Sequence, residues 1–189
     1  MRIPHPFGAA VLLLHGALPS MAMPAEASRK NWRWLRDGAL VALLFFGIRA
    51  YQHRHMPKGM APSLDGPDLG GEMASLADYR GKPVLLHFWA TWCGVCKVEQ
   101  HNIDAVSRDL PVLSVASQSG GAGEIAAYVR ERGISPRVIV DEQSVLASRF
   151  GVHAFPASFV IDGDGEIRHV EVGYTTELGL RARMWLAGL

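Results

Sequence analysis

The pattern of apolar and polar positions predicts an α/β domain in the C-terminal part of the chain. Short apolar runs typical of buried strands lie at Pro83–Trp89, Pro111–Ala116, Arg137–Val140, Ala157–Ile161 and Glu166–Val172. Segments with helical spacing lie between and after them, at Gly94–Asp109, Glu124–Arg132, Gln143–Phe150 and Thr176–Ala187. Strands that alternate with helices, followed by a hairpin and a last helix, predict a mixed central sheet with helices on both faces.

Finer features of this domain follow from the same pattern. Asp68–Tyr79 is short and interrupted by glycine, which predicts a small hairpin or turn leading into the sheet. Asp162–Gly165 joins the last two strands and predicts a β-turn. On the helix that begins at Gly94, we expect four apolar side chains on the inner side, namely Val95, Val98, Ile103 and Val106.

Two apolar stretches precede this domain. Phe7–Leu18 follows a basic residue and precedes a small-x-small pattern, as does the core of a signal peptide. The second stretch, Gly38–Ile48, has no charged residue and is flanked by tryptophan, tyrosine and arginine side chains, which favour membrane interfaces. It is shorter than the roughly 20 residues of a typical span. Because it is apolar on all sides, we nevertheless interpret it as a membrane anchor rather than as a surface helix.

These features divide the chain into four expected segments. They are a leader or cytoplasmic N-terminal segment at 1–37, a transmembrane anchor at 38–51, a tether at 52–67 and the α/β domain at 68–189. Residues 1–22 are open to two interpretations: a cleaved leader, or an upstream extension of a chain that starts at Met21 or Met23. The tether contains His53, His55 and two methionines, which could bind copper weakly, although a solvated segment is the more usual interpretation.

Charge and cysteine content narrow the possible functions. The formal net charge is +1 and no basic stripe with interleaved aromatic residues is present, so we expect no nucleic-acid partner. The two cysteines, Cys93 and Cys96, lie in one Cys-x-x-Cys motif where a buried strand passes into a helix. A thiol in the first helical turn faces unpaired N–H groups and the positive end of the helix dipole, and both favour the thiolate. A thiol three residues later lies on the same face, close enough for a disulfide. This predicts a redox couple with Cys93 attacking and Cys96 resolving.

Other uses of the cysteine pair fit the sequence less well. Zinc usually needs four ligands, and the histidines are scattered apart from the pair in the tether. A structural disulfide closing so small a ring would constrain the unfolded chain little. Copper(I) suits soft thiolates, but a small metal-carrier loop does not require the Trp-Ala-Thr-Trp sequence before Cys93. We therefore expect neither a metal nor a cofactor at the pair.

Two segments resemble the thioredoxin family. Phe88–Lys97, with the sequence Phe-Trp-Ala-x-Trp-Cys-Gly-x-Cys-Lys, resembles the thioredoxin active site. Phe150–Asp162 resembles the segment that carries the cis-proline of that fold, which would place Pro156 beside the cysteines. Further motifs are similar to the membrane-anchored thioredoxin-like reductases of bacteria, of the cytochrome c maturation and suppressor-of-copper-sensitivity types. These motifs lie at Gly81–Val84, Met56–Pro62 and Gly173–Arg181.

The resemblance implies a thioredoxin fold with an inserted strand–helix unit and a thiol:disulfide oxidoreductase activity. It also implies an anchor in the bacterial inner membrane, a catalytic domain in the periplasm, protein thiol or disulfide substrates and a membrane protein as electron donor. Trp92 and Phe155 would form an apolar rim for a partner chain, and Gly94 and Val95 would tune the redox potential. Pro156 would keep an N–H group out of the site, because proline has none.

Several positions depart from thioredoxin or have two possible roles. His87 stands where thioredoxin has a buried aspartate, and it could accept a proton from Cys96 or simply pack in the sheet. Glu99 matches a glutamate common in the anchored reductases, and it could assist proton transfer or lie on the helix surface. His101 replaces a helix-kinking proline, and Phe155 replaces the usual threonine or small residue before the cis-proline.

We therefore expect a membrane-tethered oxidoreductase that reduces protein disulfides through Cys93 and Cys96. The residues between the cysteines do not by themselves fix the direction of electron flow. Two alternatives come from other classes of protein. One is a copper-handling protein that holds Cu(I) through the cysteine pair. The other is a redoxin-type peroxidase, although Thr91–Cys93 lacks the Pro/Thr/Arg setting of a peroxidatic cysteine.

Overall fold

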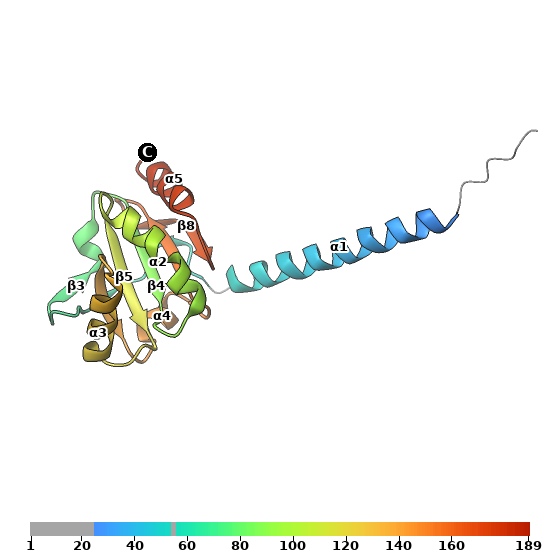
Figure 1. The fold of residues 1–189 in the computed structure, drawn as a ribbon. Helices are drawn as coiled ribbons and strands as arrows, with labels where there is room; N and C mark the ends of the chain where they lie inside the picture. Colours follow the sequence, from blue (N-terminus) through green and yellow to red (C-terminus); the bar gives the residue numbers. More distant parts are fainter. Residues whose placement is uncertain (1–24, 54–55) are drawn as a thin grey trace, which may run out of the picture. The chain divides into compact units, whose positions relative to one another are not determined.

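A computed structural model describes residues 25–53 and 56–189 of the chain. The chain divides into two units, Met1–Leu43 and Leu44–Leu189. The leader expected at residues 1–22 and the histidine at position 55 lie outside the described residues. Figure 1 shows the first described element, helix α1 (Ala25–His53), followed along the chain by the strands and helices of the second unit.

The described apolar side chains of α1 are exposed along its length. They include the tryptophans Trp32 and Trp34 and the stretch that ends at Ile48. Charged residues confine its uncharged part to Gly38–Ile48, which extends roughly 16 Å at 1.5 Å per residue, against about 30 Å for a hydrocarbon core. Among the described residues, no helix is both long and apolar enough to cross a membrane. The transmembrane anchor at 38–51 therefore stays a prediction.

The second unit is built on a six-stranded sheet in the order β1-β8-β7-β4-β5-β6. Its strands are β1 (Gly59–Met60), β4 (Val84–Trp89), β5 (Val112–Ser117), β6 (Arg137–Asp141), β7 (Ala157–Ile161) and β8 (Glu166–Val172). Strands β4, β5 and β6 are parallel, whereas β7, β8 and β1 join by antiparallel pairing. Every residue of β4 and β5 is buried. Strands that are covered on both faces consist largely of apolar residues. The sequence pattern therefore predicted these two strands.

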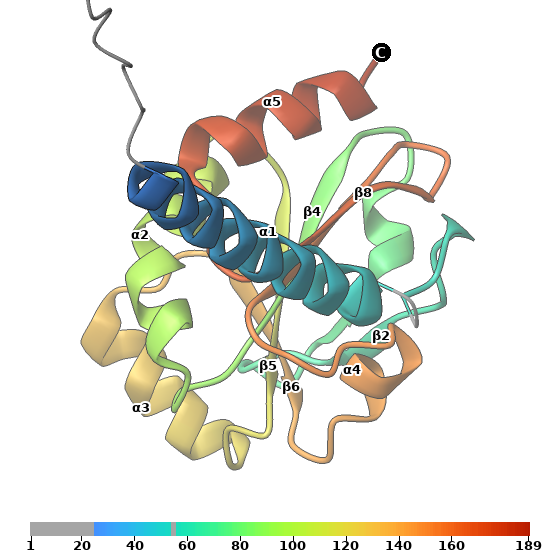
Figure 2. The same cartoon turned by 90° about the vertical axis from the view of Figure 1, so that its right-hand side faces the viewer.

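Helices cover both faces of this sheet, as predicted (Figure 2). One face carries α2 (Gly94–Ser107), α3 (Ala122–Arg132) and α5 (Glu177–Ala187). The other carries α4 (Val145–Arg149), the 3₁₀ turn η1 (Leu76–Tyr79) and the hairpin of β2 (Asp65–Pro67) and β3 (Met73–Ser75). Alternate residues of β4 face opposite ways: Leu85 and Trp89 pack with α2, and Leu86 and Phe88 pack with α4.

Side-chain caps explain where two helices begin. The Glu124 carboxylate accepts the N–H of Gly121, so α3 begins two residues before the predicted Glu124. The buried Asp141 carboxylate accepts the N–H groups of Leu146 and Ala147, so α4 begins at Val145 rather than at the predicted position 143. Local hydrogen-bond partners of this kind shift helix ends by one or two residues.

The inner face of α2 differs from the prediction. Its buried residues are Cys96, Glu99, Asn102, Ile103 and Val106. Val95 and Val98 were expected inside, but they are 46% and 60% exposed. That expectation was wrong because it assumed that only apolar side chains face the sheet. The buried positions instead recur every three or four residues from Cys96, and two of them, Glu99 and Asn102, are polar.

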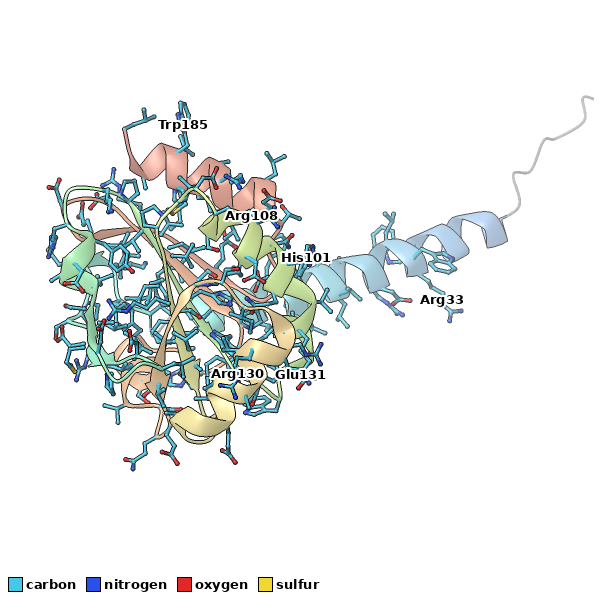
Figure 3. The ribbon with its side chains drawn as sticks, turned by 60° about the vertical axis from the view of Figure 1, so that its left-hand side comes forward. Arg33, His101, Arg108, Arg130, Glu131 and Trp185 are labelled. Carbon is cyan, nitrogen blue, oxygen red and sulfur yellow. A yellow bond between two sulfur atoms is a disulfide. The ribbon has the colours of Figure 1, made fainter. Side chains whose placement is uncertain are left out.

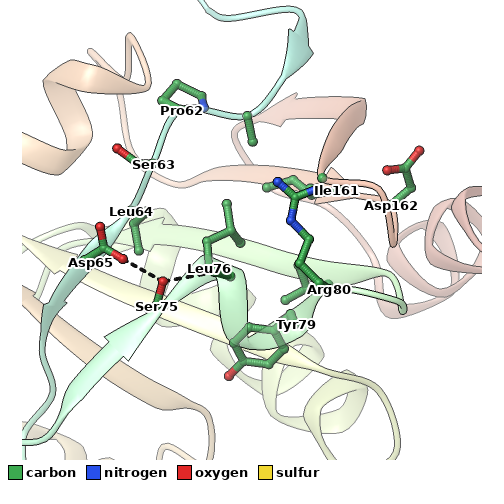
Figure 4. Close-up of a pocket in the computed structure, with 14 residues that line it drawn as sticks. Pro62, Ser63, Leu64, Asp65, Ser75, Leu76, Tyr79, Arg80, Ile161 and Asp162 are labelled. Atoms are coloured by element: carbon green, nitrogen blue, oxygen red, sulfur yellow. Dashed lines mark hydrogen bonds between the residues drawn. The ribbon is translucent and has the colours of Figure 1, made fainter.

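Residues 56–67, which we expected to form part of a tether, contribute to the folded unit instead. Met56 and Leu64 are buried in its core, β1 pairs with β8, and Arg149 donates to the carbonyl of Ser63 at 2.8 Å. This segment also lines a pocket of about 200 Å³ together with η1 and Val84 (Figure 4). Because Val84 begins β4, the pocket lies at the end of that strand away from the cysteines.

Candidate active site

The first cysteine lies at the start of α2. Cys93 is the N-cap residue, with an extended backbone (φ −76°, ψ 112°), and its Sγ accepts the N–H of Cys96 at 3.1 Å. That N–H is one of the donors that a helix leaves unpaired in its first turn. In the reduced protein, the same donor and the helix dipole would stabilise a thiolate on Cys93.

The two cysteines form a disulfide with Cα atoms 5.3 Å apart. Cys93 retains 6% of its surface and Cys96 retains 2%. Cys96 lies on the buried face of α2, in an apolar cluster with Trp89, Ile125 and Val138. A partner disulfide can therefore approach Cys93 more readily than Cys96, which fits the expected order of attack and resolution.

The loop before β7 meets the cysteines across 62 residues of sequence. The Phe155–Pro156 peptide bond is cis, and the carbonyl oxygen of Phe155 lies 3.6 Å from Sγ of Cys93. Pro156 is buried, and its own carbonyl accepts the N–H of Gly173 at 2.9 Å. The loop is thereby fixed to the end of β8, and it presents backbone to the site without adding an N–H donor from Pro156.

An apolar surface surrounds the disulfide. Trp92 is 60% exposed and contacts Phe155 edge to face, with ring centroids 5.9 Å apart. Its indole N–H donates to the carbonyl of Gln118 at 2.9 Å, which fixes the ring at the rim. The exposed side chains of Val95 and Val98 continue this surface along α2. Contiguous exposed apolar groups of this kind are typical of protein-binding sites.

His87 is buried in the sheet beneath α2. Its Nδ1 lies 2.9 Å from the hydroxyl of Ser158, and its Nε2 has no hydrogen-bond partner. Burial lowers the pKa of the imidazole to about 3, so the ring is neutral at physiological pH. A ring with so low a pKa is a weak base. Its direct role as proton acceptor for Cys96 stays a prediction.

Glu99 lies on the same face of α2 as Cys96, one turn later, and is completely buried. One carboxylate oxygen accepts the N–H of Thr175 at 2.7 Å, and the other has no partner. Burial raises the pKa of this carboxyl to about 7. The alternative of a helix-surface charge is therefore wrong. A carboxyl group with a pKa near neutrality, one helical turn from Cys96, is of the kind that can exchange protons in catalysis.

Sequence patterns did not reveal the residues that hold Glu99 in place. Asn102 donates to the carbonyl of Thr175 at 2.9 Å and to the Tyr174 hydroxyl at 3.2 Å, which ties α2 to the segment before α5. The sequence did contain one indication of this arrangement. Glu99 and Asn102 are polar and lie three residues apart, so both lie on one side of a helix that is expected to bury a face. His101, in contrast, is exposed on the outer face of α2 (Figure 3).

No metal-binding cluster is found in the described part of the chain. Within residues 25–53 and 56–189, no three side chains of His, Cys, Asp or Glu gather in a way that could hold a metal ion. The site described above comprises the cysteine pair, a buried carboxyl, a buried imidazole and an apolar rim.

Comparisons with known proteins agree with this geometry. The model of the AhpC/TSA family matches residues 57–170. The thioredoxin-like protein YneN of Bacillus subtilis is 27% identical, covering 80% of this chain and 96% of its own length. The thiol-disulfide oxidoreductase ResA of Geobacillus thermodenitrificans is 27% identical, covering 66% and 74%. A crystal structure of a putative thiol:disulfide interchange protein DsbE from Chlorobium tepidum is 26% identical, covers 70% and 98%, and has a TM-score of 0.61.

These likenesses establish a thioredoxin-like fold, and they favour neither the copper-handling nor the peroxidase alternative. The strand–helix unit that we expected as an insertion in this fold stays a prediction.

The raised pKa of Glu99 predicts a pH-dependent stability. Between pH 4.5 and about 7 the folded chain keeps a proton that the unfolded chain has lost, so this group makes stability fall as pH rises. The Glu99→Gln variant should gain stability over the parent between pH 4 and pH 8 by up to about 3 kcal/mol. Urea unfolding of both oxidised proteins across this range measures the difference. Glu131→Gln, on the exposed surface of α3, is the control, and a Glu99→Gln difference that stays constant with pH would contradict the assignment.

Proposed function

The chain belongs to the AhpC/TSA family and is a thiol:disulfide oxidoreductase with a thioredoxin-like fold, and we propose that it reduces protein disulfides in the bacterial periplasm while tethered to the inner membrane. The observation that carries the proposal is the setting of Cys93. Its sulfur caps a helix, faces the backbone of the cis-proline loop and is surrounded by an apolar rim suited to a partner chain.

The reaction begins from the reduced dithiol. The Cys93 thiolate attacks one sulfur of the partner's disulfide, an S–S bond forms between the two proteins, and the partner's other sulfur leaves with the electron pair and takes up a proton. Cys96 then gives its proton to the Glu99 carboxylate and attacks Cys93. The Cys93–Cys96 disulfide forms, and the partner's second sulfur leaves as a thiolate. The partner gains two electrons, and a membrane protein that supplies electrons would restore the dithiol.

The hydrogen bonds at the site support a reducing rather than a strongly oxidising couple. Within residues 56–189, the only donor to Sγ of Cys93 is the N–H of Cys96. Thiol:disulfide oxidoreductases that are strong oxidants have a high reduction potential because their reduced form is strongly stabilised. A single backbone donor stabilises the thiolate less than several donors or a paired cation would.

A redox titration tests the direction of electron flow. The full chain is equilibrated with glutathione buffers, and the fraction of reduced Cys93 and Cys96 is read from the mass added by an alkylating agent. We expect a midpoint closer to that of thioredoxin, about −270 mV, than to that of a strong oxidant, about −120 mV. Cys96→Ser, which cannot form the intramolecular disulfide, is the control and should form only the mixed disulfide of Cys93 with glutathione. A midpoint near the oxidant value would overturn the reductant assignment.

The tether is proposed from the composition and exposure of α1. Its uncharged stretch, Gly38–Ile48, exposes leucine, phenylalanine and isoleucine side chains, and tryptophan and arginine side chains precede it. Side chains of these types favour insertion of the apolar part into a bilayer with the amphipathic groups at the interface. Attachment would keep the dithiol near its membrane electron donor.

Membrane fractionation of cells that make the full chain tests the tether. The chain should sediment with membranes, resist extraction by high salt and be released by detergent, because apolar burial is not screened by salt. The double variant Leu43→Glu, Phe46→Glu should be released by salt or remain soluble. Release of the parent chain by salt alone would exclude a buried anchor.

Labelling of reduced cysteines by an impermeant maleimide on spheroplasts reports the compartment of the catalytic domain. If that domain faces the periplasm, the cysteines should be labelled without lysis.

A further inference from the structure

The pocket of about 200 Å³ at the end of β4 away from the cysteines takes no part in the proposed exchange reaction. Three parts of the chain enclose it: the segment from β1 to β2, the turn η1 with the residue that follows it, and the sheet where β4 begins and β7 ends. Its floor is apolar, because Leu64, Val84 and Ile161 line it and are each only 1% exposed. Apolar walls with a few polar groups are typical of small-molecule sites.

The charged side chains of this pocket lie at opposite ends. In Figure 4, Asp65 and Ser75 lie on one side, and Arg80 lies on the other and extends its guanidinium toward Ile161. The Asp65 carboxylate accepts the Ser75 hydroxyl at 2.6 Å. The pocket is therefore negative at one end, positive at the other and apolar between them.

The turn between β7 and β8 holds the Arg80 guanidinium in place. Arg80 donates to the carbonyl of Asp164, and its guanidinium lies against Gly165, where a Cβ atom would overlap it. Gly165 has a φ of 82°, which glycine adopts without strain. The N–H of Gly81 donates to the carbonyl of Gly163 at 2.9 Å, which ties the backbone next to Arg80 to the same turn. These contacts fix the guanidinium at the edge of the pocket.

The guanidinium of Arg80 has donors left for a ligand. It carries five N–H groups, and within residues 56–189 the carbonyl of Asp164 is the one acceptor that it reaches. Asp162 also lines the pocket, but its carboxylate accepts the N–H groups of Asp164 and Glu166. The same carboxylate lies 3.7 Å from the Arg168 guanidinium. The Asp162 carboxylate is thus engaged by other groups, and the positive charge at this end of the pocket is available to an anion.

We propose that this pocket binds a small monocarboxylate with an apolar body. The carboxylate accepts N–H groups of Arg80, because the planar guanidinium matches the two oxygens of a carboxylate. The apolar body covers Leu64, Val84 and Ile161 and so removes apolar surface from water. The site lies apart from the cysteines, so the inference goes beyond the proposed function and does not depend on it.

Charge and volume narrow the class of ligand further. Asp65, at the end opposite Arg80, repels a second negative charge, so a dicarboxylate of the same length should bind less well. The volume is below the roughly 300–1,000 Å³ of pockets that hold drug-sized ligands. A short free acid therefore fits the pocket, whereas a long acyl chain or a folded peptide segment does not.

Amide chemical shifts of the full chain in detergent micelles measure binding at this site. Hexanoate is the probe, and the amide signals of Ala61, Leu76 and Gly165, which line the pocket, should shift and saturate as it is added. Hexanol has the same chain length without the charge, and it should bind at least about tenfold more weakly, because charge-assisted hydrogen bonds are the stronger ones. Equal binding of hexanol and hexanoate, or no saturable shift with hexanoate, would overturn the proposal. This comparison uses the parent chain alone and needs no variant to fold.

Two cation variants form a matched pair. Arg80→Gln should weaken hexanoate binding by about tenfold or more. Lys82→Gln should leave it unchanged, because Lys82 is an exposed cation close in sequence that does not line the pocket. Equal losses in both variants would indicate a general effect of net charge and would contradict the role of Arg80.

A third variant tests the opposite end of the pocket. Asp65→Asn keeps an acceptor for the Ser75 hydroxyl but removes the negative charge. Adipate, a dicarboxylate of the same length as hexanoate, should bind weakly to the parent chain and more tightly to Asp65→Asn. Adipate that binds the parent chain as tightly as hexanoate does would contradict the assigned selectivity for a monocarboxylate.

Discussion

The hydrogen bond from the Cys96 N–H to the Cys93 sulfur joins the chemistry of this protein to its fold. It exists because β4 ends and α2 begins within a few residues, so that Cys93 occupies the N-cap while Cys96 is buried one turn later. The cis-proline loop then reaches the same sulfur from the far side. An exchange site built in this way depends on two segments that only the folded sheet brings together.

The face beneath α2 combines apolar packing with buried polar groups. A fully apolar layer would favour stability, since unpartnered buried polar atoms carry a desolvation cost. This chain keeps a carboxyl, an imidazole and two serine hydroxyls there, between the dithiol cluster and the cluster under α5. Burial moves the pKa of Glu99 up toward neutrality and that of His87 down, which is the arrangement expected where one group is to exchange protons and the other is to remain neutral. In the proposed reaction, the carboxyl of this layer takes up and returns the proton of Cys96.

The sequence was sufficient for features that depend on local patterns. Buried strands appeared as continuous apolar runs, and the cysteine spacing located the start of α2. It was insufficient where the outcome depends on partners far along the chain. Val95 and Val98 were assigned to the core because they are apolar, yet Glu99 and Asn102 take the inner positions by bonding the segment before α5. The contact of His87 with Ser158 follows from strand register, which no single strand reveals. Residues 56–67 lack periodicity but contribute to the core through Met56 and Leu64.

In the proposed reaction, Cys93 attacks a protein disulfide and Cys96, on the buried face of α2, resolves the product. Trapping of mixed disulfides in cells that make the full chain tests it most directly, with Cys96→Ala compared against Cys93→Ala. The structure predicts that Cys96→Ala accumulates disulfide-linked complexes with protein partners that dissociate on reduction, and that Cys93→Ala accumulates few. Equal accumulation in both variants, or more in Cys93→Ala, would contradict the assignment of the attacking sulfur and with it the account of the site.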